Sequence, residues 1–98
     1  MRLSSSPTIL KQMRQARLRR LRRLGFVLAG SLVSQPKHTS RYLTDPVRGK
    51  TRTLYIPLDR LDEVKTWNAE YREGKRLLRE LSAIQRALLI GEIRAARR

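Results

Sequence analysis

Residues 58–98 read LDRLDEVKTWNAEYREGKRLLRELSAIQRALLIGEIRAARR, and this stretch decides the fold because its pattern predicts one long helix. Mostly apolar residues recur at alternating steps of three and four, which is the heptad spacing of helices that pack on other helices. The repeat falls on Val64, Trp67, Tyr71, Gly74, Leu78, Leu81, Gln85 and Leu88. Leu77, Ile84 and Leu89 widen the apolar face beyond a two-stranded seam.

A helix over residues 59–96 would be about 57 Å long, at a rise of about 1.5 Å per residue. Such a helix cannot cover its own apolar face. We expect the first helix of the chain, a second subunit, or both to cover it. The predicted assembly contacts are Val64, Trp67, Tyr71, Leu78, Leu81 and Leu88.

The middle of the chain predicts β-structure. Two β-prone runs, residues 41–44 and 51–56, flank the sequence DPVRGK, whose Asp-Pro and Gly favour a turn with its tip near Arg48 and Gly49. On the second strand, Thr51, Thr53 and Tyr55 should face one way, and Arg52, Leu54 and Ile56 the other. Residues 31–34 form a third short run, so we expect a β-hairpin or a three-stranded meander that packs on a helix.

The first segment predicts an arginine-rich helix. Ser5 or Ser6 is suited to cap it, and Pro7 to its first position. Its apolar face should carry Ile9, Met13, Ala16, Leu21, Leu24 and Leu28, with Arg17 and Arg20 in or beside it. Gly25 or Gly30 should end the helix, and the core could extend through Phe26 and Val27.

The predicted fold class is therefore α+β, in a single structural domain. It has an N-terminal basic helix, a central β-hairpin or three-stranded meander, and a long C-terminal heptad-patterned helix that forms a helical hairpin or a coiled-coil assembly. These parts correspond to residues 1–29, 30–57 and 58–98.

Positive charge is concentrated near the start of the chain. The 98 residues include 23 Lys and Arg against 8 Asp and Glu, a net charge of +15 at pH 7. Residues 1–24 carry eight basic side chains and no acidic one. Such a field attracts phosphate polymers and anionic membranes. Arginine outnumbers lysine by 18 to 5, and its planar fork matches phosphate oxygens and guanine edges.

These features predict a nucleic-acid interface in which the basic helix contacts phosphates. The hairpin would enter a major groove as a two-stranded ribbon or lie along phosphates. The predicted contacts are Lys11, Arg14, Arg17, Arg19, Arg20, Arg22, Arg23, Lys37, Arg41, Arg48, Lys50 and Arg52. The alternatives are a merely solvated face, the acidic surface of a protein partner, a mitochondrial transit peptide and a membrane surface.

Catalytic and metal-binding patterns are missing from the sequence. There is no cysteine, the single histidine is His38, and no phosphate-loop, dinucleotide or His-Glu-x-x-His pattern occurs. No apolar stretch approaches the roughly 20 residues that span a bilayer. We therefore expect no enzymatic activity, no cofactor, no metal and no membrane partner, and a cytoplasmic location in association with a nucleoid or a ribonucleoprotein.

Three motifs of the chain carry a family resemblance. They are GSLV at residues 30–33, GKTRTLYIP at 49–57, and a long helix with Trp67 and Tyr71. Together they resemble a domain of unknown function in short bacterial and archaeal proteins that are often encoded among mobile genetic elements. Family members commonly carry a cysteine cluster after GSLV, suggestive of a small metal knuckle. Here the corresponding SQPKHTS has no cysteine, so the metal inference fails.

The resemblance covers about residues 30–90 and implies an accessory role beside a transposase, an integrase or a similar nucleoprotein. Our hypothesis is a small non-enzymatic nucleic-acid-binding accessory protein. Its expected partners are DNA or RNA, together with further copies of itself or a larger protein. The alternative is a coiled-coil adaptor or structural subunit that docks on a larger protein or ribonucleoprotein.

Overall fold

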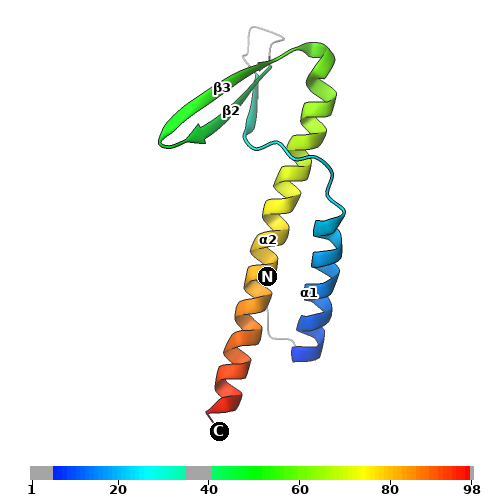
Figure 1. Cartoon of the computed structure of the whole chain (residues 1–98), viewed down its shortest axis with the longest axis vertical. Helices are drawn as coiled ribbons and strands as arrows, with labels where there is room; N and C mark the ends of the chain where they lie inside the picture. Colours follow the sequence, from blue (N-terminus) through cyan, green and yellow to red (C-terminus); the bar gives the residue numbers. More distant parts are fainter. Residues whose placement is uncertain (1–5, 35–40, 98) are drawn as a thin grey trace. The chain divides into compact units, whose positions relative to one another are not determined.

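A computed structural model describes residues 6–34 and 41–97 and has the expected α+β architecture (Figure 1). The elements in order are α1 (Pro7–Arg22), β1 (Ser31–Ser34), β2 (Arg41–Val47), β3 (Lys50–Ile56), a 3-10 turn η1 (Leu58–Arg60) and α2 (Leu61–Ala96). They form two compact units. One contains α1 and the part of α2 from residue 74 onward, and the other contains residues 25–73.

The first unit is a helical hairpin. Leu10 of α1 packs on Ile84 and Leu88 of α2, and all three are buried. At the other end of α1, Leu24 comes so close to Gly74 that a Cβ added there would lie 3.0 Å from its side chain. Residue numbers therefore rise along α1 while those of their partners fall along α2, so the two helices are antiparallel. Because Gly74 has no side chain, Leu24 can approach α2 closely at this position.

Helix α1 begins as predicted but ends earlier. The hydroxyl of Ser6 accepts a hydrogen bond from the Ile9 N–H at 3.4 Å, and Pro7 is the first helical residue. The helix ends at Arg22, before both glycines that were expected to end it. In the second unit, the Gly25 N–H donates to a carboxylate oxygen of Glu70 at 2.9 Å. This bond gives the chain leaving α1 a partner outside the helix.

The packed face of α1 differs from the expected one. Ile9 is 49% exposed and Ala16 is exposed, whereas Leu10 is buried. The inner face consists of Leu10, Met13, Arg14, Arg17, Leu18, Leu21 and Leu24. The pattern of apolar residues did not predict this face correctly, because two of its members are arginines. Phe26 and Val27 are also exposed, so the core does not extend through them.

The packed face of α2 is rotated by about one residue from the predicted heptad. Leu77 and Ile84, which we expected to flank the repeat, are among the most buried side chains of the protein. Leu78 is 58% exposed, and Gln85 is exposed as well. A broad apolar face offers two adjacent rows of side chains, and α1 packs on the second row. Val64 and Leu88 are buried as expected, while Trp67, Tyr71 and Leu81 are half-buried.

The second unit is a three-stranded antiparallel meander in the order β1-β2-β3 with the start of α2. Leu43 of β2 and Ile56 of β3 pack with Val64 of α2. The partly buried residues around this cluster are Leu28, Leu32, Leu61 and Trp67. The meander and the direction of Ile56 confirm the sequence prediction.

The β2–β3 hairpin turns at Arg48 and Gly49, as predicted. Both residues have positive φ, 50° and 78°, which is the backbone of a two-residue turn that matches the twist of its strands. However, β2 continues through Pro46 to Val47, where we expected the turn to begin. Pro46 pairs with Thr51 of β3, and β1 pairs with β2 only as far as Thr44. The missing N–H of proline is therefore tolerated on the open side of the strand.

A polar contact fixes the connection into the sheet. The buried amide of Asn68 donates to the carbonyl oxygens of Leu28 at 3.0 Å and Gly30 at 2.8 Å. In return, the Leu28 N–H donates to the Trp67 carbonyl at 3.1 Å. The buried amide of Asn68 thereby has two hydrogen-bond acceptors and links α2 to the connection before β1.

We expect Gly30→Ala to destabilise the protein by about 2–3 kcal/mol, because its φ of +120° strains any L side chain. The new Cβ would also lie 2.7 Å from the Thr44 carbonyl oxygen. Urea denaturation measures the effect. Gly91→Ala is the control, since nothing lies within 4 Å of its Cβ position and the change should stabilise α2 by about 0.5–1 kcal/mol. Equal midpoints for the two variants would contradict the assignment.

Candidate nucleic-acid interface

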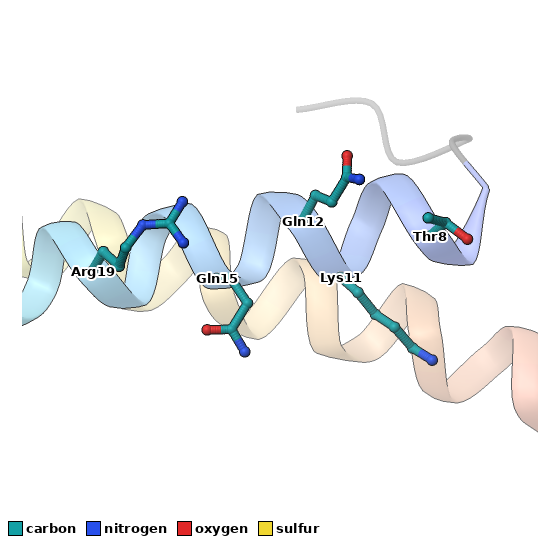
Figure 2. A pocket seen from close by; sticks show the side chains of 5 residues that line it. All are labelled: Thr8, Lys11, Gln12, Gln15 and Arg19. Carbon is teal, nitrogen blue, oxygen red and sulfur yellow. The ribbon is translucent and has the colours of Figure 1, made fainter.

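One exposed face of α1 carries polar and basic side chains that project away from the helix. Five of them border a shallow surface hollow and are shown in Figure 2: Thr8, Lys11, Gln12, Gln15 and Arg19. Thr8, Gln15 and Arg19 lie at helical spacing with both Lys11 and Gln12, each three or four residues from its neighbours, so the five lie on one side of the helix. All five are exposed, and this side is opposite to the one that packs on α2. We call it the outer face of α1.

The outer face and its borders are strongly basic. Lys11, Arg19, Arg22 and Arg23 are exposed, and none of them forms an ion pair with another residue in the described part of the chain. No acidic residue occurs anywhere in α1. Their mutual repulsion is therefore not offset within the helix, and an anionic partner would relieve it.

Two of the predicted binding residues lie on the inner face instead. The Arg14 guanidinium donates to the side-chain oxygen of Gln85 at 2.8 Å, and Arg17 pairs with Glu80 through Nε at 2.7 Å. Arg76 approaches the other carboxylate oxygen of Glu80. The structure thus engages Arg14 and Arg17 in the contact between α1 and α2. Arg20 is exposed at the edge between the two faces.

The hydrogen bond from Arg17 lowers the pKa of Glu80 below its ordinary value, and Arg76 acts in the same direction. A lowered pKa in the folded state stabilises the protein above the ordinary pKa of glutamate, about 4.3. That stabilisation is lost as the pH falls through the lowered value. We therefore expect Glu80→Gln to reduce the melting temperature at pH 7. The difference from the unsubstituted protein should shrink toward pH 3, and a difference independent of pH would contradict this role.

The hairpin presents its basic residues unevenly. Arg48 and Lys50 are exposed at the tip, whereas Arg52 pairs with Asp45 across the strands at 2.8 Å. Arg41 is half-buried opposite Ile56. The remaining predicted contact, Lys37, lies outside the described residues, as does His38.

Tyr55 lies on the face of the sheet that is turned away from the long helix. Its neighbour Ile56 faces the helix, and side chains alternate along a strand. Tyr55 is 53% exposed and contacts Tyr42 across the strands, with ring centroids 5.8 Å apart in an edge-to-face arrangement. The aromatic pair therefore lies on the face of the sheet that is turned away from its core, with Tyr55 exposed and Tyr42 half-buried.

Other kinds of site find little support in the described residues. Across residues 6–34 and 41–97, no group of three His, Asp or Glu side chains is arranged to hold a metal ion. Within the same ranges, no helix combines the length and hydropathy needed to cross a membrane. Comparison with protein-family models, curated proteins and solved structures finds no significant match to the chain.

Sequence reasoning missed the neutral members of the outer face, Thr8, Gln12 and Gln15. It selected residues by charge, and these three have none. A signal was nevertheless present, because they share the helical phase of Lys11 and Arg19. Counting charges along the chain does not take account of where residues lie around the helix axis.

Proposed function

We propose that this protein is a small non-enzymatic nucleic-acid-binding protein and that α1 is its main contact element. The observation that carries the proposal is the outer face of α1, which is exposed, basic and free of acidic residues. Lys11, Arg19, Arg22 and Arg23 contact phosphate oxygens. Arg48 and Lys50 at the hairpin tip add backbone contacts.

The helical hairpin supports this use of α1. An isolated helix of 16 residues is marginal in water, and six like charges weaken it further. Packing on α2 holds α1 helical through Leu10 and the Arg17–Glu80 pair, while Lys11, Arg19 and Arg22 stay exposed. The protein thus keeps an unfavourable concentration of positive charge in a fixed arrangement.

The biological setting is the finer part of the proposal. The resemblance of residues 30–90 to proteins encoded among mobile elements supports an accessory role in a transposase-type or recombinase-type nucleoprotein complex. Gly30, whose positive φ and close contact with Thr44 require glycine, belongs to the GSLV motif of that resemblance. The glycine of this motif therefore has a structural role in this fold.

Binding to duplex DNA and duplex RNA at increasing salt tests the proposal. Each phosphate contact contributes about −0.9 to the slope of log affinity against log salt for duplex DNA, so the four contacts on α1 alone give about −3.6, and contacts at the hairpin tip make the slope steeper. A rise from 50 to 200 mM salt should then weaken DNA binding by at least about 150-fold. Fluorescence anisotropy with labelled 20-base-pair duplexes measures this. No binding at 50 mM salt, or an affinity independent of salt, would contradict the proposal.

A second candidate function, assembly on another protein, is favoured by an exposed apolar row on α2. Leu78, Leu89 and Ile93 are 58%, 51% and 42% exposed. A coiled-coil adaptor would bury this row against its partner. Sedimentation after nuclease treatment separates the two functions, because an adaptor stays in a complex with its protein partner and a nucleic-acid-binding protein is released.

A further inference from the structure

The outer face of α1 changes in chemistry along its length. Its first half presents, beside Lys11, three neutral side chains that carry both donors and acceptors: Thr8, Gln12 and Gln15. Its last turns present arginines only, at Arg19 and Arg22. A surface that bound phosphates alone would need no carboxamides. Glutamine donates and accepts at once, which is the pattern that matches the adenine edge in the major groove of DNA.

We propose that the outer face of α1 enters the major groove of duplex DNA and that Gln12 and Gln15 read adenine there. The inference rests on the proposed nucleic-acid binding and adds to it the class of duplex and the readout residues. Lys11, Arg19 and Arg22 flank the two glutamines and hold the helix against phosphates on either side.

The dimensions agree with this placement. Thr8 and Gln15 are seven residues apart, which is about 10 Å along a helix axis. Three base-pair steps of B-DNA, at about 3.4 Å each, have the same length. Figure 2 shows Gln12 projecting to one side of α1 and Lys11 and Gln15 to the other, so the side chains spread across the width of the face. The B-form major groove, about 12 Å wide, admits a helix.

The same geometry disfavours duplex RNA. The major groove of A-form RNA is deep and narrow, so the side chains of a helix such as α1 do not reach its base edges. Phosphate contacts alone would not separate the two duplexes. Recognition of base edges by Gln12 and Gln15 would separate the two duplexes, because it needs a groove that admits the helix.

A selection experiment tests the inference with the full chain. The protein is used to enrich a pool of random 20-base-pair DNA duplexes, and the double variant Gln12→Ala with Gln15→Ala is used in parallel. Both substitutions favour helix and remove no charge, so α1 should stay folded and basic. We expect the unsubstituted protein to enrich a subsite of two to four base pairs that contains adenine. The variant should lose that preference, about fivefold to 150-fold per contact, and should keep its salt slope on random DNA.

A second arm compares the enriched sequence as duplex DNA and as duplex RNA, and DNA should bind more tightly. Absence of an enriched subsite, a preference that survives in the variant, or equal affinity for the RNA duplex would each overturn the inference. These results are distinct from failure of the proposed function. In that case neither duplex would bind at low salt, and no sequence could be enriched.

Discussion

Replacing Lys11, Arg19, Arg22 and Arg23 with Gln is expected to weaken binding to duplex DNA at least 100-fold at 50 mM salt. All four are exposed, and none is in an ion pair with another described residue, so the change leaves the contacts between α1 and α2 in place. Each cation that is replaced means that fewer counterions are released from the DNA on binding, and the contribution of that release to the affinity is lost. Circular dichroism should show an unchanged helix content, because glutamine and the residues that it replaces have similar helix propensities.

The chain supplies a matched control on α2. Lys65, Arg72, Arg79 and Arg86 are also one lysine and three arginines, and all four are exposed. Their replacement with Gln lowers the net charge by the same amount, so the general attraction to DNA falls equally. If the outer face of α1 is the contact surface, this control should lose much less affinity. Equal losses in the two variants would show that net charge, and no particular face, governs binding.

Ile84→Ala is expected to destabilise the helical hairpin by about 3–4 kcal/mol. Ile84 is fully buried and packs on Leu10 and Leu88, so truncation leaves a cavity as well as losing apolar burial. Helix α1 depends on that contact, because a helix of 16 residues is marginal alone. We therefore expect the variant to lose helix content at 37 °C and, with it, the DNA binding. Urea denaturation and circular dichroism measure both effects.

Two further variants show whether the effect belongs to the packed face. Ile84→Val removes one methyl group and should cost about 1 kcal/mol. Leu78→Ala truncates the exposed neighbour row of α2 and should change the stability by less than about 1 kcal/mol. If Leu78→Ala proved more damaging than Ile84→Ala, the original heptad assignment would be right and the packed face described above would be wrong.

The sequence predicts the elements of this fold well because each has a local signal. Pro7 after Ser6 marks the start of α1, and Arg48-Gly49 between β-prone runs marks the turn. Short extended or β-prone runs at residues 31–34, 41–44 and 51–56 mark the three strands of the meander. These signals depend on neighbouring residues only, and the structure confirms them.

The sequence does not determine which row of a broad apolar helix face is packed. Leu77 and Leu78 are adjacent and chemically identical, yet the first is buried and the second is exposed. The choice depends on the helix that packs there. The ion pair of Arg17 could not be predicted for the same reason, because its carboxylate partner, Glu80, is 63 residues away in the chain. Asn68, which bonds the carbonyls of Leu28 and Gly30, has no local signal either.

The candidate site was predicted in part. The position of the basic segment followed from charge alone, but its division into an inner and an outer face did not. Arg14 and Arg17 are among the residues predicted to contact phosphate, and in the structure they lie on the inner face, bonded to Gln85 and Glu80. The structure thus narrows the proposed contacts on α1 to residues of its exposed side.

The salt dependence of DNA binding, compared between the unsubstituted protein and the two fourfold glutamine variants, tests the central claim most directly. We predict that replacing the four α1 cations reduces the slope of log affinity against log salt by about 3.6, which is four contacts at about 0.9 each. The α2 control should keep a slope close to that of the unsubstituted protein. An α1 variant with an unchanged slope would contradict the claim that the outer face of α1 contacts the phosphates.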